Sequence, residues 1–380
     1  MASERARLLI PGPVDVDDDV LEAMAEPVRP HYGEEWLAIY SEVVDHLKQV
    51  FSTENDLFLV PGPGTAALDA ALGSLMRTGD KVLVARNGFF GDRLAAMARA
   101  YGLDVRHVSA PLGQPIEPAA VRRALAAGPG IEAVAVVHLE TSTAVLNPVE
   151  RIAAAAHDFE VPIIVDAVSS LGGVPLPVDE WGIDICVSVA NKCLACPAGV
   201  APISISQRAW DQMERKGERA HGWYLNLDVW RDFAHNWASW HPYPTTQPTN
   251  VIYAILIQLR RIIAEGLDTY HRRHVVAAQS VRTGLRRLGF EMFTPDAYAS
   301  PLLTAVRGLP GMDVEDMRRY LLEEWQVMVS GGLSELRGEL FRVGHAGKAA
   351  SQEYVEQFLA GVEAYLRLRG YDVAPAQDGD

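Results

Sequence analysis

The residue whose type and surroundings most suggest chemistry is Lys192. An apolar run from Ile185 to Val189 precedes it, and a loop with Pro197 and Gly199 leads into a second apolar run from Val200 to Ser206. This pattern predicts a strand, a turn and a second strand, with the lysine at the end of the first. Apolar surroundings lower the pKa of a lysine, and its neutral amine is a nucleophile. The common alternative is a lysine whose amine simply reaches water.

Asp166 makes a catalytic interpretation of Lys192 stronger. It ends another apolar segment that begins at Val161, and so lies at a second predicted strand end. An amine and a carboxylate at neighbouring strand ends are the pair that pyridoxal phosphate needs. The amine holds the aldehyde of the cofactor as a Schiff base, and the carboxylate keeps its pyridine nitrogen protonated. The pair therefore favours pyridoxal 5'-phosphate as cofactor, with Lys192 and Asp166 as catalytic residues.

A candidate phosphate site lies earlier in the chain. A predicted strand from Asp56 to Val60 is followed by Pro61-Gly-Pro-Gly-Thr65 and by a helical stretch from Ala66 to Leu72. A glycine-rich turn at the start of a helix offers free backbone N–H groups and the positive end of the helix dipole to an anion. No Gly-Lys-Ser/Thr follows, so this is not a nucleotide P-loop. Taken alone, the stretch could also be an ordinary turn.

The order of predicted elements indicates an α/β fold. Apolar strands alternate with helices up to about Ser206, which favours a mostly parallel sheet covered on both faces. Ligands of such sheets bind at the carboxyl ends of the strands. The C-terminal third predicts a smaller α+β domain, and the tail after Asp372 is expected to be disordered. We expect an N-terminal arm at 1–18, a large domain at 19–262 and a small domain at 263–380.

Composition excludes several classes of function. The 380 residues are 49% hydrophobic and 22% charged, with a net charge of −15, so nucleic acid and anionic membrane surfaces are poor partners. No apolar run approaches the ~18 residues of a membrane span, and the stretch Met1-Ala-Ser-Glu-Arg contains no apolar signal core; we expect a cytoplasmic protein. Cys193 and Cys196 form a C-x-x-C, but no second pair at ligand spacing supports a metal, and none is expected.

The chain resembles the class V (fold-type I) pyridoxal-phosphate aminotransferases, within the alanine–glyoxylate and serine–pyruvate group. The resemblance runs from Leu8-Leu-Ile-Pro-Gly-Pro13 to Phe341-Arg-Val-Gly344. Its most specific parts are Val165-Asp-Ala-Val-Ser-Ser-Leu-Gly-Gly173 and the stretch from Asn191 to Gly199. It implies the fold-type I architecture, a homodimer with shared active sites, and an N-terminal arm that joins the small domain and the dimer interface.

The resemblance also implies roles for individual residues. Lys192 would hold the cofactor and move the proton of the substrate α-carbon, while Asp166 would pair with the ring nitrogen. The remaining implied contacts are Gly64, Thr65 and Asn191 at the phosphate, Phe90 and Val168 on the two faces of the ring, Thr141 and Ser142 near the ring oxygen, Tyr243 and Thr246 reaching the phosphate of a neighbouring subunit, and Arg342 with Pro13 at the substrate. Phe90 could instead be plain core and Arg342 a surface ion pair. His31 and His345 receive no role.

These features lead to a functional hypothesis with alternatives. The enzyme would move an amino group from alanine or serine to glyoxylate or pyruvate by a ping-pong mechanism. Asn191-Lys192-Cys193 is closer to the branches that use 2-aminoethylphosphonate or pyridoxamine, so these donors and ureidoglycine remain alternatives. A lyase or desulfurase is less favoured, because no cysteine follows Cys196. The intact Lys192 and Asp166 pair argues against a non-catalytic binding protein.

Overall fold

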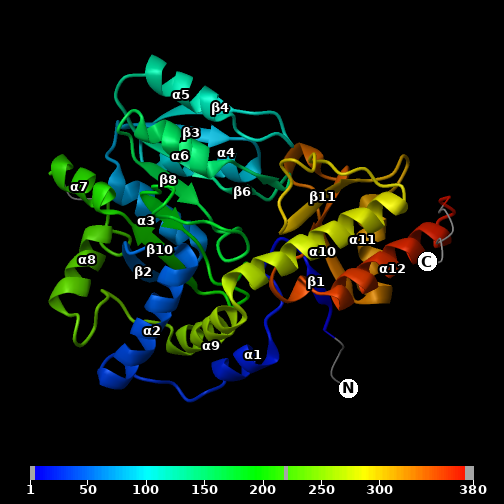
Figure 1. The fold of residues 1–380 in the computed structure, drawn as a ribbon, viewed down its shortest axis with the longest axis horizontal. Coiled ribbons are helices and arrows are strands. Elements are labelled where there is room, and N and C mark those ends of the chain that lie inside the picture. Colours follow the sequence, from blue (N-terminus) through cyan, green and yellow to red (C-terminus); the bar gives the residue numbers. More distant parts are fainter. Residues whose placement is uncertain (1–4, 218–220, 373–380) are drawn as a thin grey trace.

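A seven-stranded sheet forms the centre of the protein (Figure 1). The computed structural model describes residues 5–217 and 221–372. Strand β10 runs antiparallel to its neighbours β9 and β2, whereas the other neighbouring strands pair in parallel. The prediction of a mostly parallel sheet is therefore confirmed. In spatial order the strands are β2 (Asp56–Pro61), β10 (Val200–Ile205), β9 (Ile185–Val187), β8 (Ile163–Asp166), β5 (Ile131–Val137), β3 (Lys81–Arg86) and β4 (Asp104–Ser109).

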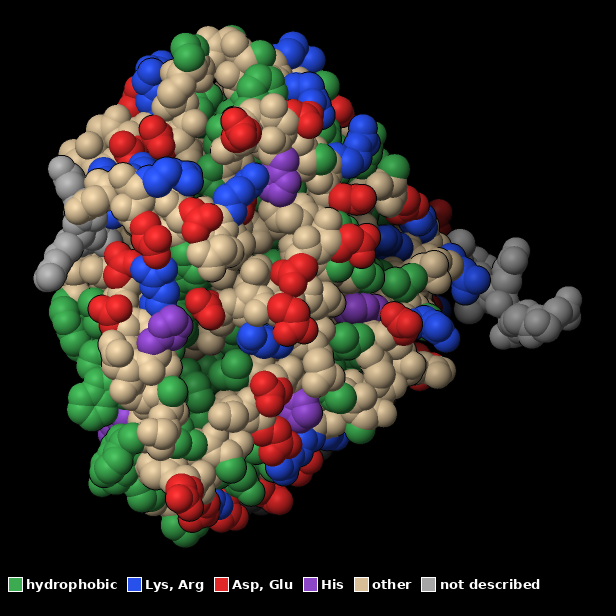
Figure 2. Space-filling model, turned by 60° about the vertical axis from the view of Figure 1, so that its left-hand side comes forward, with side chains coloured by type: hydrophobic (Ala, Val, Ile, Leu, Met, Phe, Trp, Pro, Cys, Tyr) green, Lys and Arg blue, Asp and Glu red, His purple; other side chains and the backbone are tan. Residues whose placement is uncertain are grey.

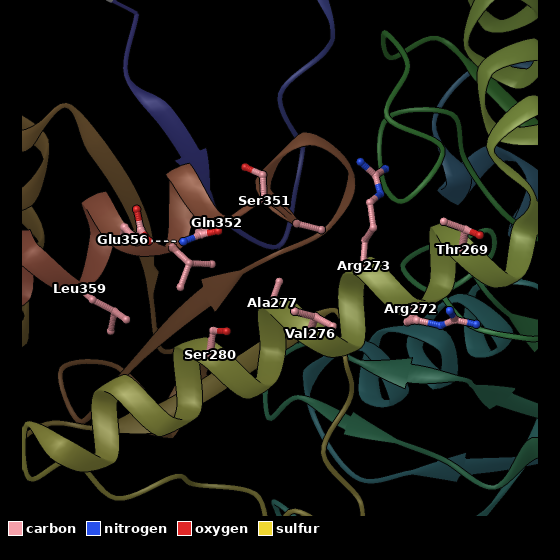
Figure 3. A pocket seen from close by; sticks show the side chains of 12 residues that line it. Thr269, Arg272, Arg273, Val276, Ala277, Ser280, Ser351, Gln352, Glu356 and Leu359 are labelled. Atoms are coloured by element: carbon pink, nitrogen blue, oxygen red, sulfur yellow. Dashed lines mark hydrogen bonds between the residues drawn. The ribbon is translucent and has the colours of Figure 1, made fainter. Parts of the chain in front are cut away.

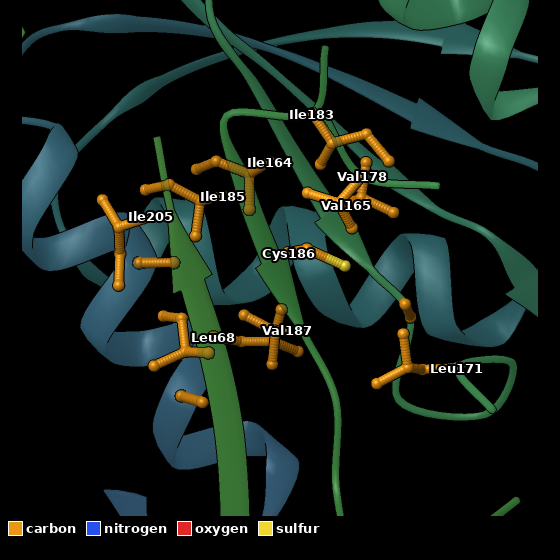
Figure 4. Close-up of a cluster of buried hydrophobic side chains, with 14 of the residues drawn as sticks. Leu68, Ile164, Val165, Leu171, Val178, Ile183, Ile185, Cys186, Val187 and Ile205 are labelled. Atoms are coloured by element: carbon orange, nitrogen blue, oxygen red, sulfur yellow. The ribbon is translucent and has the colours of Figure 1, made fainter. Parts of the chain in front are cut away.

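The central strands are rich in valine and isoleucine because both of their faces are covered. Successive side chains point to opposite faces of a strand. In Figure 4, Val187 of β9 lies toward Leu68, whereas Cys186 points to the other side, toward Leu171. These residues are buried in one continuous hydrophobic core. The core fixes the strand ends, and so it fixes the residues that follow them.

Helices cover this sheet and begin largely where sequence patterns predict them. Apolar residues at helical spacing predict a helix from Glu34 to Phe51, and the structure has a helix with those bounds. Helices α7 and α8 were not predicted; both begin at a polar cap, Ser206 and Asn226, whose side chain accepts a backbone N–H. The helices are α2 (Glu34–Phe51), α3 (Gly64–Leu75), α4 (Phe89–Ala100), α5 (Pro118–Ala127), α6 (Val149–His157), α7 (Gln207–Lys216), α8 (Leu227–Asn236) and α9 (Thr249–Glu265).

A second sheet of four strands lies at the other end of the molecule (Figure 1). Strand β1 (Arg7–Leu9) comes from the N-terminal arm and pairs in parallel with β12 (Val327–Gly331), which is followed in order by β13 (Leu340–Gly344) and β11 (Leu303–Arg307). Helices α10 (Leu267–Arg287), α11 (Val314–Trp325) and α12 (Gln352–Leu368) accompany this sheet. Tyr270 and Val281 of α10 belong to different hydrophobic cores, so α10 connects both parts. The domain boundaries remain a prediction.

Short elements complete the described chain. They are α1 (Asp18–Met24), the paired strands β6 (Leu139–Glu140) and β7 (Val145–Leu146), and two single 3-10 turns, η1 (Ser334–Leu336) and η2 (Gly347–Ala349). The tail predicted to be disordered after Asp372 lies outside the described residues. None of the described helices combines the length and the apolar character needed to cross a bilayer. Figure 2 shows acidic and basic side chains intermixed over one face.

Candidate active site

A cavity of about 190 Å³ lies where the carboxyl ends of the central strands meet. Lys192 and Asp166, 26 positions apart in the sequence, both line it. Most of the predicted cofactor contacts line it as well. The complete lining is Pro63, Gly64, Thr65, Leu68, Phe90, Arg93, Leu94, Met97, Val137, Leu139, Asp166, Val168, Ser169, Val189, Asn191 and Lys192.

The predicted phosphate cradle forms one wall of this cavity. Helix α3 begins at Gly64, so the backbone N–H groups of Gly64 and Thr65 have no partner within the helix, whereas that of Ala66 donates to the carbonyl of Pro63. A Cβ atom at Gly64 would lie 2.6 Å from Cγ2 of Val168, which explains why this position is glycine. Thr65 follows in the first turn, and its hydroxyl accepts a hydrogen bond from Arg93.

Asp166 is the last residue of β8 and is 7% exposed. Its Oδ1 accepts the backbone N–H of Val168 at 3.0 Å, and no cationic side chain of the described residues lies within ion-pair distance. Burial raises the pKa of Asp166 to about 6, and the nearby Glu140 adds to the increase. A buried carboxylate without a partner is unfavourable. The site therefore suits a cationic group of a ligand, such as a protonated ring nitrogen.

The amine of Lys192 lies between this cavity and the N-terminal arm. Its Nζ donates a hydrogen bond to the carbonyl oxygen of Pro11 at 2.6 Å. Burial lowers the pKa of Lys192, and the neighbouring Arg342 adds to the effect. A Cβ at Gly12 would come within 2.7 Å of Nζ, so only glycine permits this approach. The predicted substrate contact Pro13 is exposed; Pro11 is the proline that contacts the lysine.

Arg342 projects from β13 of the smaller sheet and is only 6% exposed. Its Nε donates to the carbonyl of Gly331 at 2.8 Å, and its Nη1 donates to the carbonyl of Thr141 at 3.0 Å. Burial lowers the pKa of Arg342 to about 10, and Arg318 contributes to the decrease. No carboxylate of the described residues lies within 4 Å of it. The alternative of a surface ion pair is therefore wrong, because this guanidinium is buried and unpaired.

Thr141 connects Arg342 to the lysine. It lines a very small hollow of about 10 Å³ that Lys192 also borders. Ser142, predicted near the cofactor ring, instead turns its hydroxyl to Glu140 and to the backbone N–H of Phe89. Ser142 therefore supports the wall of the site.

Glu140 is a residue to which the sequence interpretation gave no role. Its side chain is fully buried at the end of β6 and accepts the N–H groups of Phe90 and Gly91 at 3.0 Å each. The backbone N–H and the hydroxyl of Ser142 also donate to it. A carboxylate at a helix N-terminus satisfies free N–H groups and the helix dipole. Glu140 thus fixes the start of α4, and with it the ring of Phe90.

We expect Glu140→Gln to destabilise the protein by about 1–3 kcal/mol, because an amide is a weaker acceptor and one of its ends is a donor. Thermal denaturation of the cofactor-free protein measures the effect as a loss of several degrees in Tm. Glu117→Gln is the matched control, since Glu117 precedes α5 without a side-chain cap. Equal Tm values for the two variants would contradict the assigned role of Glu140.

Tyr243 and Thr246, the residues predicted to reach a second subunit, differ in their exposure. The Tyr243 side chain is buried within its own chain, where its hydroxyl donates to the carbonyl of His31 and accepts from Trp36 Nε1. Thr246 is exposed. Their contact with a neighbouring phosphate stays a prediction.

The sequence interpretation assigned no role to His31 or His345, and each of them forms a hydrogen bond with another side chain. His31 Nδ1 lies 3.1 Å from His241 Nε2, and His345 Nε2 lies 2.9 Å from the hydroxyl of Thr304. Burial lowers the pKa of His345, which keeps its ring neutral. Neither residue lines the cavity at Lys192.

A larger hollow of about 450 Å³ lies between α10 and α12 (Figure 3). Val276, Ala277 and Leu359 make its floor largely apolar, and Arg272 and Arg273 lie at one end. It contains none of the predicted site residues. Cavity size alone therefore does not point to the predicted site residues, whereas the partly buried Lys192 and the buried Asp166 both line the cavity at the strand ends.

The fold and this cavity define a pyridoxal-phosphate-dependent enzyme of the α/β type. The family model described as Aminotransferase class-V matches residues 21–338. The chain belongs to the class V aminotransferase family, and the predicted family and fold-type I architecture are confirmed.

Similar proteins agree with this assignment. An uncharacterized aminotransferase of Methanocaldococcus jannaschii is 37% identical, over 96% of this chain and 94% of that protein. The crystal structure of an alanine–glyoxylate aminotransferase from Nostoc sp. is similar, with a TM-score of 0.92, 34% identity and 97% coverage of both chains. A ureidoglycine–glyoxylate aminotransferase from Bacillus subtilis has a TM-score of 0.93 and 29% identity, covering 99% of this chain and 97% of that one.

The cofactor of the family is pyridoxal phosphate, and the residues of the cavity fit it. An amine, a buried carboxylate without a counter-ion and a helix N-terminus surround one space. These groups match the aldehyde, the ring nitrogen and the phosphate of the cofactor. Phe90 and Val168 provide apolar surface for the ring.

Proposed function

We propose that this enzyme transfers an amino group from a small amino acid, alanine or serine, to a small 2-oxo acid, glyoxylate or pyruvate, by a ping-pong mechanism. The observation that carries the proposal is Arg342, a buried guanidinium without an anionic partner, joined through Thr141 to the surroundings of Lys192. A buried unpaired arginine is unfavourable unless a ligand supplies the anion. A carboxylate of an amino or oxo acid meets this requirement in a bidentate geometry.

The other residues have complementary roles. Pyridoxal phosphate, when bound, would supply an electron sink for the α-carbon of the amino acid. Lys192 Nζ would take and return the proton of that carbon, since burial favours its neutral form. Asp166 holds the ring nitrogen in its cationic form, and Phe90 and Val168 restrict the position of the ring.

The hollow beside Lys192 supports a small substrate. It measures about 10 Å³ and lies between the N-terminal arm and apolar side chains. Ile10, Val14 and Leu302 line it together with Pro11. A methyl or hydroxymethyl side chain is compatible with such a confined apolar space, whereas a long polar side chain would leave its polar groups unpaired.

A half-reaction screen tests the identity of the donor. The loaded enzyme is mixed with one amine at a time, without an oxo acid, and the visible absorption of the cofactor is followed. We expect rapid loss of the band with alanine or serine. The screen includes ureidoglycine, pyridoxamine and 2-aminoethylphosphonate, which are the alternative donors. A response only to one of these three would refute the proposed donor and keep the enzyme class.

Replacement of Arg342 by glutamine tests the proposed carboxylate contact. We expect kcat/KM for alanine to fall about 10²-fold, mainly through KM, because a charge-assisted bidentate contact is lost. Arg337→Gln changes an exposed arginine near the same strand and is the matched control. An unchanged KM in Arg342→Gln would refute the contact.

We also propose a cytoplasmic homodimer with shared active sites. The exposed aromatic surface of Tyr32 and Trp240, whose rings stack at 5.5 Å, supports a covered interface. Trp223 and Trp237 are exposed as well. Thr246 and Tyr243 would approach the neighbouring site, and the arm at 1–18 would join the interface, with a large domain at 19–262 and a small one at 263–380. Light scattering after size-exclusion chromatography measures the mass, and a monomeric mass would refute this part.

A further inference from the structure

We propose that Arg93 provides the positive charge that holds the phosphate of the cofactor, and that it sets the preference of the enzyme for the phosphorylated cofactor. The proposal rests on the cofactor of the family and is independent of which amino donor is used. Arg93 was absent from the contacts that the sequence suggested.

The position of Arg93 places it at the phosphate cradle. It lies on α4, one turn after Phe90, and lines the same cavity as Lys192 and Asp166. Its Nη2 donates a hydrogen bond to the hydroxyl of Thr65, in the first turn of α3. Its guanidinium carbon lies 5.9 Å from the centre of the Phe90 ring. Helix α4 therefore presents a ring contact and a cation to the same ligand.

The charges of the cavity give the second argument. A phosphate monoester carries up to two negative charges, and the first turn of a helix provides only about half a positive charge. Lys192 is committed to the aldehyde of the cofactor. Among the described residues, Arg93 is the other cation that lines the cavity. Its side chain is exposed, donates to Thr65 and has no carboxylate of the described residues within 4 Å. A cation is therefore available where the phosphate needs one.

Neighbouring charged groups on α3 and α4 do not neutralise Arg93. Asp69 on α3 and Asp166 at the end of β8 both lie near enough for Arg93 to affect them. Burial raises the pKa of each carboxyl, and Arg93 opposes this increase without forming an ion pair. Arg86 is paired with Asp92 at 2.7 Å. Arg99, two turns further along α4, lies 2.9 Å from Nε2 of His107. Arg93 thus differs from Arg86 and Arg99 because it lines the cavity, and no carboxylate of the described residues forms an ion pair with it.

The test compares pyridoxal phosphate with pyridoxal, which lacks the phosphate. Apo-protein of wild type, Arg93→Gln and the control Arg99→Gln is titrated with each compound, and the cofactor absorption gives Kd. We expect Arg93→Gln to raise Kd for pyridoxal phosphate at least about 10-fold and to change Kd for pyridoxal less than about two-fold. Arg93→Lys should recover part of the affinity, since it restores a point charge without the planar fork. Equal losses for both compounds, or no loss for either, would overturn the proposal.

A double-mutant cycle separates direct contact from an effect through Thr65. If Arg93 only orients the threonine, Arg93→Gln will cost no affinity in a Thr65→Val background. Direct contact predicts that most of the loss remains. Inorganic phosphate gives an independent readout: it should raise the Tm of wild-type apo-protein more than that of Arg93→Gln, with chloride at equal ionic strength as control. Because no amino acid is present, a wrong choice among the amino-acid donors would leave all these results unchanged.

Discussion

Replacement of Lys192 by alanine is expected to reduce transamination by at least about 10⁴-fold. The variant loses both the nucleophile that holds the cofactor and the base that moves the substrate proton, and each kind of contribution is large. The amine has no substitute at this place, because no other lysine of residues 5–217 and 221–372 lines the cavity. Steady-state assays with the best donor from the half-reaction screen measure the loss.

A chemical readout distinguishes this loss from misfolding. Borohydride treatment of the loaded wild-type protein should fix the cofactor permanently on Lys192, which peptide mass spectrometry detects. Lys192→Ala should retain the wild-type circular dichroism spectrum and release all cofactor on denaturation after the same treatment. Lys81→Ala is the control, since Lys81 begins β3 and bonds to Pro129. A labelled Lys192→Ala protein, or full activity in it, would refute the central role of this amine.

Sequence patterns predicted the central fold because local chemistry determines it. Apolar strands such as Val200–Ile205 and amphipathic helices such as Glu34–Phe51 have recognisable periods. The carboxyl ends of parallel strands then gather Asp166, Lys192 and the start of α3 at one edge. The two helices that were missed, α7 and α8, lie next to or within the stretch from His221 to Pro244, which is rich in aromatic residues and shows no simple apolar period.

Contacts between distant segments could not be predicted in the same way. Glu140 has its role because its carboxylate meets the start of α4, 49 positions away at Gly91. Arg93 gains its role because its guanidinium reaches the hydroxyl of Thr65, 28 positions away at the start of α3. Pro11 meets Lys192 across 181 positions. Glycines offered a partial signal, because Gly12, Gly64 and Gly88 each stand where a Cβ would collide with a site residue or its support.

Replacement of Asp166 by asparagine is expected to have opposite effects on activity and on apo-protein stability. Loss of the charge facing the ring nitrogen should lower kcat about 10²–10³-fold, as expected for a preorganised electrostatic contact. Without cofactor, however, the ionised carboxylate destabilises the folded protein, because burial raises the pKa of Asp166 from 3.8 to about 6. The folded protein binds the proton of the Asp166 carboxyl more tightly than the unfolded chain does. The stability that comes from this bound proton is therefore fully present below about pH 4 and is lost as the pH rises through 6.

The sign of the stability effect follows from that difference in pKa. Removing the carboxylate should make the apo-protein more stable relative to wild type as the pH rises, by about 1.5 kcal/mol at pH 5 and about 3 kcal/mol at pH 8. The cost of burying an asparagine amide is the same at both pH values, so the change between them is the decisive quantity. Urea denaturation at pH 5 and pH 8 measures it, with Asp232→Asn on the exposed side of α8 as control.

Binding of the cofactor should reverse the order of stability of wild type and Asp166→Asn. Bound pyridoxal phosphate supplies the missing cation to Asp166, so it should stabilise wild type much more than Asp166→Asn at pH 8. A variant that is less stable than wild type as apo-protein at pH 8, by the same margin as at pH 5, would show that Asp166 is already neutralised within the chain. The carboxylate would then have no unmet charge to direct at a ring nitrogen, and the assignment of this cavity to the cofactor would lose its main electrostatic support.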